Sequence, residues 1–213
     1  GEVCFNTSLE GYFEVLTDPS YAGQIVTMTY PQIGNYGIDP DDVQSAYPGS
    51  TERGAATPAL RGMIVHDMCH TPSNWRSSIS LPEYLKDNGI VAVEGIDTRA
   101  LVRHLRDHGA QQGIISTEVF DLAELAAKLA EAPALVGENL VKTVSCADEY
   151  SYVAADLPAA HAFADAAPAP AKYRVVVYDC GIKRGILEGL VRVGCELTVV
   201  PWNTPASHAL EMN

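Results

Sequence analysis

Short alternating runs of apolar and polar residues dominate the first part of the chain. Residues 24–30 (QIVTMTY) alternate in the way that predicts a strand, and further strands are predicted at residues 62–65 and 90–93. Between residues 1 and 37, small and turn-forming residues are interleaved with aromatic and β-branched ones. This mixture predicts short buried strands joined by tight turns rather than a flexible loop.

Helical spacing appears after these strands. Ser80 and Glu83 stand three residues apart, as in a capping box, and predict a short helix that stops at Gly89. Two more helices are predicted, from residue 97 or 98 to 109 and from 121 to 129, with a strand between them at residues 113–116.

The last part of the chain has a different character. Residues 154–171 contain ten Ala and three Pro, and predict a linker or a surface excursion. An apolar strand (174–178), a helix (182–193) and a second strand (196–200) then follow. A strand buried on both faces, followed by helix and strand, is typical of a parallel α/β sheet. We therefore expect an α/β domain to about residue 150 and the first unit of a second, doubly wound domain, which is too small to be stable alone.

Composition restricts the partners and the compartment. With 47% apolar and 19% charged residues, the 213-residue chain is typical of a soluble globular protein. The net charge of −13 argues against nucleic acid or anionic membrane as a principal partner. No apolar run approaches the ~18 residues of a transmembrane helix, and no signal peptide is visible. The five cysteines form no CxxC pair, which favours reduced, mostly buried thiols in a cytoplasmic protein.

Three stretches of the chain resemble one family and stand in that family's order. Residues 5–37 contain the runs FNTSLEGYFEVLTDPSYAGQIV and TYPQIGNYG, which resemble the beginning of the small (glutaminase) chain of glutamine-dependent carbamoyl-phosphate synthase. Residues 93–117 (VEGIDTRALVRHLRDHGAQQGIIST) resemble a later part of that chain. Residues 175–204 (VVVYDCGIKRGILEGLVRVGCELTVVPWNT) are similar to the opening of its class I amidotransferase domain. The resemblance covers nearly the whole chain.

The resemblance implies a domain organisation. It implies an N-terminal mixed β/β/α domain at residues 1–150, a linker at 151–172 and, at 173–213, the first strand–helix–strand of a doubly wound parallel-sheet amidotransferase domain. In the family, the Gly-rich oxyanion loop, the nucleophilic Cys and the His/Glu pair come later in the chain. The resemblance therefore implies a truncated amidotransferase domain and a fragment that is inactive alone.

For the parent enzyme, the resemblance implies hydrolysis of L-glutamine and delivery of ammonia to a large partner subunit, which makes carbamoyl phosphate for arginine and pyrimidine synthesis. ATP and Mg²⁺ would be used by that large chain, and no cofactor or metal is expected in this one. A non-catalytic assembly or binding module is the alternative function. A glutaminase that serves another synthetase is a third, although most amidotransferases lack the N-terminal domain.

Ser20 is the candidate site residue. Locally, the run TDPSY (17–21) predicts a turn, in which Pro fixes φ while Asp and Ser bond nearby backbone. The resemblance implies a different role, because the matching serine of the family lies at the domain interface and contacts the glutamine substrate. We therefore expect Ser20 to be a binding group and not a nucleophile.

Cys180 is a second position to weigh. It lies between a predicted strand and a predicted helix, where helix amides together with Lys183 and Arg184 would lower its thiol pKa. The family's nucleophile belongs instead to a later strand and to a Gly-x-Cys-x-Gly elbow, which none of the five cysteines has. We expect Cys180 to be a small buried residue, and no catalytic residue in this chain.

Two histidine groups raise the question of a metal site. His66, Cys69 and His70 offer three ligands within five residues, yet a strand would point 66 and 70 to one face and 69 to the other. No fourth ligand has a recognisable spacing. His104 and His108 share one helix face without a partner motif, so solvated side chains are expected.

The same helix carries Arg99, Arg103 and Arg106 within an acidic chain. A solvated face is the simpler interpretation, and a contact with a partner subunit is the alternative.

Overall fold

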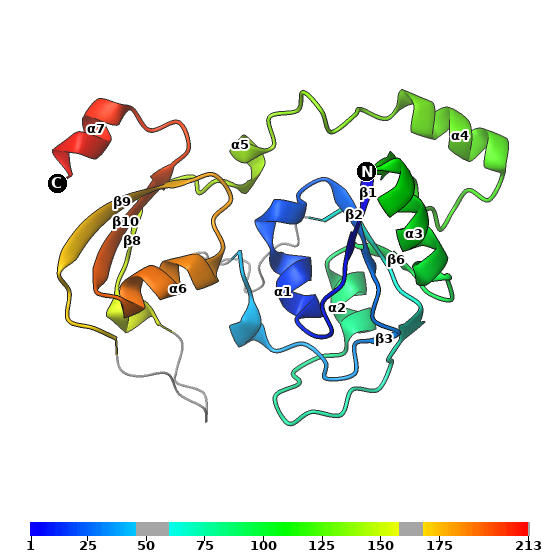
Figure 1. Cartoon of the computed structure of the whole chain (residues 1–213), viewed down its shortest axis with the longest axis horizontal. Coiled ribbons are helices and arrows are strands. Elements are labelled where there is room, and N and C mark those ends of the chain that lie inside the picture. The colour runs from blue at the N-terminus through cyan, green and yellow to red at the C-terminus, as the bar shows by residue number, and fades with distance from the viewer. Residues whose placement is uncertain (46–59, 158–167, 213) are drawn as a thin grey trace. The chain divides into compact units, whose positions relative to one another are not determined.

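The computed structural model describes residues 1–45, 60–157 and 168–212 (Figure 1). Contacts divide these residues into two compact units, one with residues 1–43 and 60–138 and the other with residues 44–45, 139–157 and 168–212. Each unit has its own sheet. The family domain ranges 1–150 and 173–213 stay predictions, and the contact division places residues 139–150 with the second unit.

Five strands form the main sheet of the first unit, in the order β6-β4-β2-β1-β7. Their bounds are Glu2–Asn6 (β1), Gln24–Met28 (β2), Gly62–Ile64 (β4), Val91–Val93 (β6) and Gln111–Gln112 (β7). Strands β1, β2, β4 and β6 run parallel, and β7 pairs antiparallel with β1. The strands predicted at 24–30, 62–65 and 90–93 are therefore confirmed as β2, β4 and β6.

Both faces of this sheet are covered, because successive strand residues point to opposite faces. Ile25 of β2 packs with Leu105 of α3 (Thr98–His108) on one face. Its neighbour Val26 is fully buried on the other face. The alternating pattern of β2 thus reflects two apolar layers rather than one buried and one wet face.

Two helices lie across the sheet from α3. Figure 1 shows α1 (Tyr12–Thr17) and α2 (Leu81–Asp87) on one side of the strands and α3 on the other. Phe13 of α1 meets the ring of Tyr84 of α2 edge to face, with ring centroids 5.1 Å apart. Such aromatic pairs contribute about 0.5–1.5 kcal/mol beyond their buried area, so this contact fixes α1 against α2.

The predicted helix starts are confirmed. Ser80 Oγ accepts a hydrogen bond from the Glu83 amide at 3.4 Å, and the Glu83 carboxylate accepts from the Ser80 amide at 3.1 Å, which closes the capping box of α2. Asp97 and Asp121 cap α3 and α4 (Leu122–Glu131) with one bond each, in which the Asp carboxylate accepts from the backbone amide three residues further on.

Two local predictions in this unit are wrong. Residues 113–116 form no strand; β7 ends at residue 112, and Ile115 is packed against the α3 side of the sheet rather than paired in it. The predicted strands and turns of residues 1–37 also include a helix, α1, which follows Gly11 at φ 82°. The aromatic and β-branched residues of α1 favour β structure locally, but their burial against the sheet stabilises the helix instead.

Smaller elements complete the first unit. A two-stranded parallel pair joins β3 (Gln32–Ile33) to β5 (Asp67–Met68), and 3₁₀ turns span Pro19–Tyr21 and Pro40–Asp42. Helix α4 has no buried residue, although its apolar positions have helical spacing.

The second unit contains a three-stranded sheet in the order β8-β10-β9. Its strands are Tyr150–Tyr152 (β8), Tyr173–Asp179 (β9) and Cys195–Pro201 (β10). β9 and β10 run parallel and are joined by α6 (Arg184–Arg192), which confirms the predicted strand–helix–strand unit. Buried core residues of this unit are Cys146, Tyr152, Leu187, Val191, Leu197 and Val199. Short helices α5 (Val141–Val144) and α7 (Ala206–Glu211) lie outside the sheet.

Two expectations about this unit differ from the structure. β9 was expected to be buried on both faces, yet Val175 and Val177 are only partly buried against the α6 core and Tyr178 is 39% exposed. The predicted linker at 151–172 begins inside β8, whose antiparallel pairing with β10 holds residues 150–152 in the sheet. Residues 158–167 of that linker lie outside the described residues.

Candidate functional site

Ser20 lies in a tight turn that directly follows α1. The Asp18 carboxylate accepts a hydrogen bond from the Ser20 amide at 2.8 Å, and the Asp18 carbonyl accepts from the Tyr21 amide at 3.1 Å. Pro19 occupies the first position of the 3₁₀ turn, where its fixed φ fits and no amide is needed. The turn predicted from the run TDPSY is confirmed.

Contacts of Asp18 and Tyr21 hold the turn, and the Ser20 side chain is exposed. Asp18 is 7% exposed, and the Tyr21 hydroxyl accepts a hydrogen bond from Asn6 Nδ2 at 3.0 Å, which ties the turn to the end of β1. Ser20 is exposed. Within the described ranges its hydroxyl has no protein partner, so it can both donate to and accept from a ligand. No histidine or carboxylate is hydrogen-bonded to it there, as activation to a nucleophile requires.

The other end of α1 is fixed by two tyrosines that the sequence did not single out. The Tyr36 hydroxyl accepts hydrogen bonds from the amides of Gly11 (2.7 Å) and Tyr12 (3.2 Å), which otherwise lack partners at a helix start. The Tyr12 ring stacks on the Tyr36 ring with centroids 4.2 Å apart, and its hydroxyl donates to the Gly37 carbonyl at 2.6 Å.

Burial raises the pKa of both the Tyr12 and the Tyr36 hydroxyl, so both stay protonated at neutral pH. The helix that precedes Ser20 is thus held at both ends. The sequence pattern that could have pointed to Tyr36 is the run GNYG at residues 34–37, where a glycine on each side of Asn-Tyr is typical of a tight turn that presents an aromatic side chain.

Cys180 does not have the surroundings that the sequence predicted. It is exposed, whereas a small buried residue was expected. The buried group at this strand end is its neighbour Asp179, whose carboxylate accepts hydrogen bonds from the Gly181 and Ile182 amides, both at 2.9 Å. Because Asp179 binds the amides of the turn, the Cys180 side chain is left on the outside.

The other cysteines are less buried than expected, and two of them are poor nucleophiles. Only Cys146 is fully buried among the five, all of which lie in the described ranges. Burial raises the pKa of the Cys4 thiol and of the Cys146 thiol to about 11 in each case, with a further contribution from the charges of Glu2 and Asp179 respectively. Both thiols are therefore protonated at neutral pH and weakly nucleophilic.

The histidine groups have structural partners. His66 Nδ1 lies 3.0 Å from the Ile96 carbonyl, and His70 Nε2 lies 3.5 Å from a Glu94 carboxylate oxygen. Cys69 Sγ contacts the Thr71 carbonyl at 3.3 Å and does not join the two histidines in a ligand group. Among the residues described, no group of three or more His, Cys, Asp or Glu side chains is arranged to hold a metal ion.

The three arginines of α3 are all exposed. The Arg106 guanidinium pairs with the neighbouring Asp107 at 2.9 Å, which offsets part of the basic side. The rings of His104 and His108 stack on the same helix with centroids 4.3 Å apart. This geometry fits a solvated face, and it leaves Arg99 and Arg103 accessible to an acidic partner. In the part of the chain that is described, no helix has the length and apolar character of a membrane span.

Comparison with protein families gives one assignment. The profile described as "Carbamoyl-phosphate synthase small chain, CPSase domain" matches residues 1–115 of this chain, which include the Ser20 turn.

Similar curated proteins carry the name carbamoyl phosphate synthase small chain. The protein of Syntrophotalea carbinolica is 52% identical over 213 residues, which are 100% of this chain and 54% of the relative. That of Thermosynechococcus vestitus is 47% identical over 211 residues (99% and 52%), and that of Pseudomonas aeruginosa is 47% identical over 217 aligned residues (100% and 54%). The chain spans about half the length of the curated relatives it matches.

Proposed function

Because the chain belongs to the carbamoyl-phosphate synthase small-chain family, we propose that the whole protein hydrolyses L-glutamine and supplies the ammonia to a large partner chain. The large chain uses ATP and Mg²⁺ to combine this ammonia with bicarbonate, and the carbamoyl phosphate serves arginine and pyrimidine synthesis in the cytoplasm. The name "small chain" of these relatives supports the existence of a large partner.

The proposed chemistry is acyl transfer to a cysteine. A thiolate attacks the amide carbon of glutamine, the carbon–nitrogen bond breaks and ammonia leaves, and water then hydrolyses the thioester to glutamate. Backbone amides stabilise the oxyanion in both steps. By resemblance, the nucleophile stands in a Gly-x-Cys-x-Gly elbow, which none of the five cysteines of this chain has.

In this proposal, the present chain contributes one wall of the glutamine pocket through Ser20. The observation that carries it is the exposed Ser20 side chain on a turn whose amides at Ser20, Tyr21 and Ala22 are all hydrogen-bonded within the chain. A hydroxyl presented in this way loses little freedom when it binds a ligand, because Asp18 and the anchored α1 have already ordered the turn.

The substitution Ser20→Ala tests this role in the complete enzyme. We expect glutamine-dependent kcat/KM to fall by roughly 5- to 150-fold, the equivalent of ~1–3 kcal/mol for a lost hydrogen bond. Synthesis from added ammonia should change little, because free ammonia bypasses the glutamine pocket.

Ser8→Ala is the matched control. Ser8 is also exposed, and its amide donates to the side chain of the residue two positions earlier, Asn6, at 2.7 Å. Its removal should leave both rates unchanged. Equal losses with glutamine and with ammonia in the Ser20 variant would reduce Ser20 to a structural turn residue.

A further inference from the structure

Glu14 is the one acidic residue of α1, a helix whose other residues are all buried. Its carboxylate oxygen Oε2 is buried as well, and within the described ranges of the chain this oxygen has no hydrogen-bond partner. Burial without a partner disfavours the ionised form of a carboxyl group much more than its protonated form. The two protonation states of Glu14 therefore fit this position unequally.

The amide that could satisfy the Glu14 carboxylate is already used. Glu14 stands at the third position of α1 after the N-cap residue Gly11, from which a Glu side chain can accept from the N-cap amide. Its carboxylate lies beside Gly11, since a Cβ atom added there would be 3.6–3.8 Å from the carboxylate atoms. The Gly11 amide, however, donates to the Tyr36 hydroxyl at 2.7 Å. Tyr36 thus caps α1 in place of Glu14.

An ionised Glu14 would face an excess of negative charge. The ionisable groups that face it within the described residues are two carboxylates, two tyrosines and one arginine: Glu10, Asp42, Tyr12, Tyr36 and Arg76. Both tyrosines are neutral at neutral pH. The Arg76 guanidinium already pairs with Asp39 and, at 3.2 Å, with Asp42.

These surroundings act on the protonation equilibrium of Glu14. Burial raises the pKa of its carboxyl group above the ordinary value, and the charges of Asp42 and Glu10 add to the rise. Its own backbone amide and the charge of Arg76 act in the opposite direction. Below the ordinary pKa, Glu14 is protonated whether or not α1 is in place. As the pH rises from the ordinary pKa through the raised one, the folded arrangement loses stability.

We propose that Glu14 is a pH-sensitive switch: α1 and the turn that carries Ser20 are held most firmly while Glu14 carries a proton, and less firmly once it is ionised. The turn is included because Asp18 ends α1 and also accepts the hydrogen bond of the Ser20 amide. The switch is a property of the first unit and does not depend on the role proposed for Ser20.

Glu14→Gln tests the switch, because glutamine keeps the shape of a protonated glutamate and does not ionise. The measurement is amide hydrogen exchange in the whole protein, in peptides that cover residues 12–21, corrected for the intrinsic effect of pH on exchange. The ratio of protection factors, variant over wild type, should lie near one at about pH 5 and rise towards about pH 8. The rise should reach about tenfold for each unit by which the pKa is raised.

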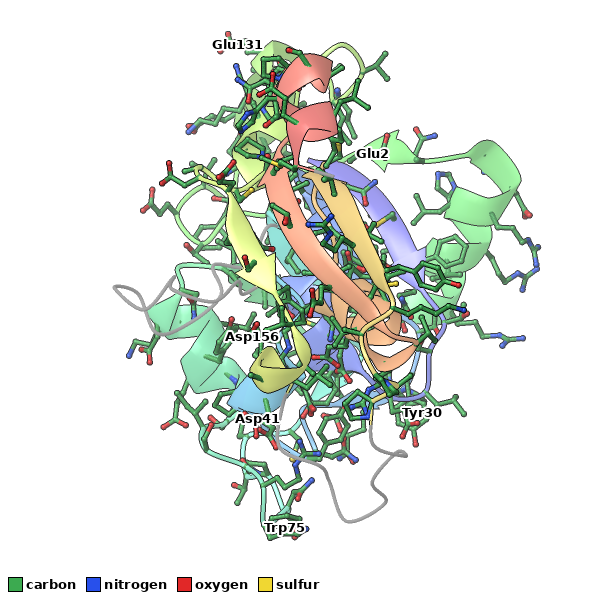
Figure 2. The ribbon with its side chains drawn as sticks, turned by 90° about the vertical axis from the view of Figure 1, so that its left-hand side faces the viewer. Glu2, Tyr30, Asp41, Trp75, Glu131 and Asp156 are labelled. Atoms are coloured by element: carbon green, nitrogen blue, oxygen red, sulfur yellow. The ribbon has the colours of Figure 1, made fainter. Side chains whose placement is uncertain are left out.

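Glu131→Gln is the matched control. Glu131 is exposed at the end of α4 in the same unit, and Figure 2 shows its side chain at the outer end of that helix. Its replacement should leave the protection of residues 12–21 unchanged at every pH.

Two results would overturn the switch. A ratio that stays constant with pH would show that Glu14 ionises equally easily with α1 closed and open. A ratio that falls as the pH rises would show that a cation elsewhere in the whole protein stabilises the ionised carboxylate. Neither result bears on glutamine hydrolysis, which the Ser20→Ala experiment tests separately.

Discussion

The 213-residue chain assayed alone is expected to release no measurable ammonia from glutamine, whereas the whole protein proposed above is expected to turn glutamine over. The proposed chemistry needs a thiolate in an oxyanion-binding elbow, and none of the five cysteines stands in that motif. The raised pKa values of Cys4 and Cys146 keep those thiols protonated. Cys180 is exposed and lies beside a turn whose amides are occupied by Asp179.

The measurement is ammonia release at saturating glutamine, with the whole protein as the positive control. Turnover by the chain alone that disappears in Cys180→Ala would show that Cys180 is a nucleophile after all. Turnover that survives replacement of all five cysteines would require a different mechanism. If the whole protein is also inactive, with or without a large chain, the non-catalytic assembly module becomes the better account.

Asp179→Ala is expected to open the second unit locally. The Asp179 side chain, in a residue only 5% exposed, accepts hydrogen bonds from three backbone amides, of which the buried Cys146 amide at 2.7 Å comes from outside the turn. We expect a loss of about 3 kcal/mol, because hydrogen bonds to charged groups contribute roughly 1.5–3 kcal/mol each and an unpaired buried donor costs roughly 1–3 kcal/mol.

Amide hydrogen exchange in the whole protein measures this loss at its site. Protection of the peptides that contain Cys146 and the turn at Gly181 should fall on the order of a hundredfold, which corresponds to ~3 kcal/mol of local opening. Asp148→Ala is the control, since Asp148 is exposed in the same segment and its removal should change protection by no more than ~0.5 kcal/mol. Unchanged protection in Asp179→Ala would mean that packing alone holds the turn.

Local chemistry made much of the fold predictable. The capping residues Ser80, Asp97 and Asp121 start their helices as expected, because a side-chain acceptor at a helix start acts over three residues and needs no tertiary contact. The parallel β9–α6–β10 unit was predictable for a similar reason, since its apolar runs and the glycine turn lie close together in sequence.

The errors arose where tertiary contacts decide. Helix α1 is made of residues with strand preference, and its start depends on Tyr36, which is 24 residues further along than Tyr12. The run at 113–116 has the composition of a strand, but Ile115 packs against the cluster that includes Leu105 of α3. β9 looked doubly buried because its side chains are apolar, and the sequence does not state which face is covered.

The candidate site was predictable only in part. The turn at Ser20 followed from Asp18 and Pro19, whereas its substrate role came from resemblance and stays a prediction. The exposure of Cys180 could not be foreseen, because it depends on the Asp179 carboxylate binding amides on both sides of the strand end.

The central claim is that the amide nitrogen of glutamine passes through this protein into carbamoyl phosphate. The most direct measurement combines the whole protein, the large chain, ATP, Mg²⁺, bicarbonate and glutamine labelled with heavy nitrogen at the side-chain amide, in the presence of excess unlabelled ammonium. The account predicts that carbamoyl phosphate carries the label whenever the whole protein is present, and carries none when it is omitted. Carbamoyl phosphate that shows only the unlabelled nitrogen of the bulk ammonium, with both chains present, would contradict it.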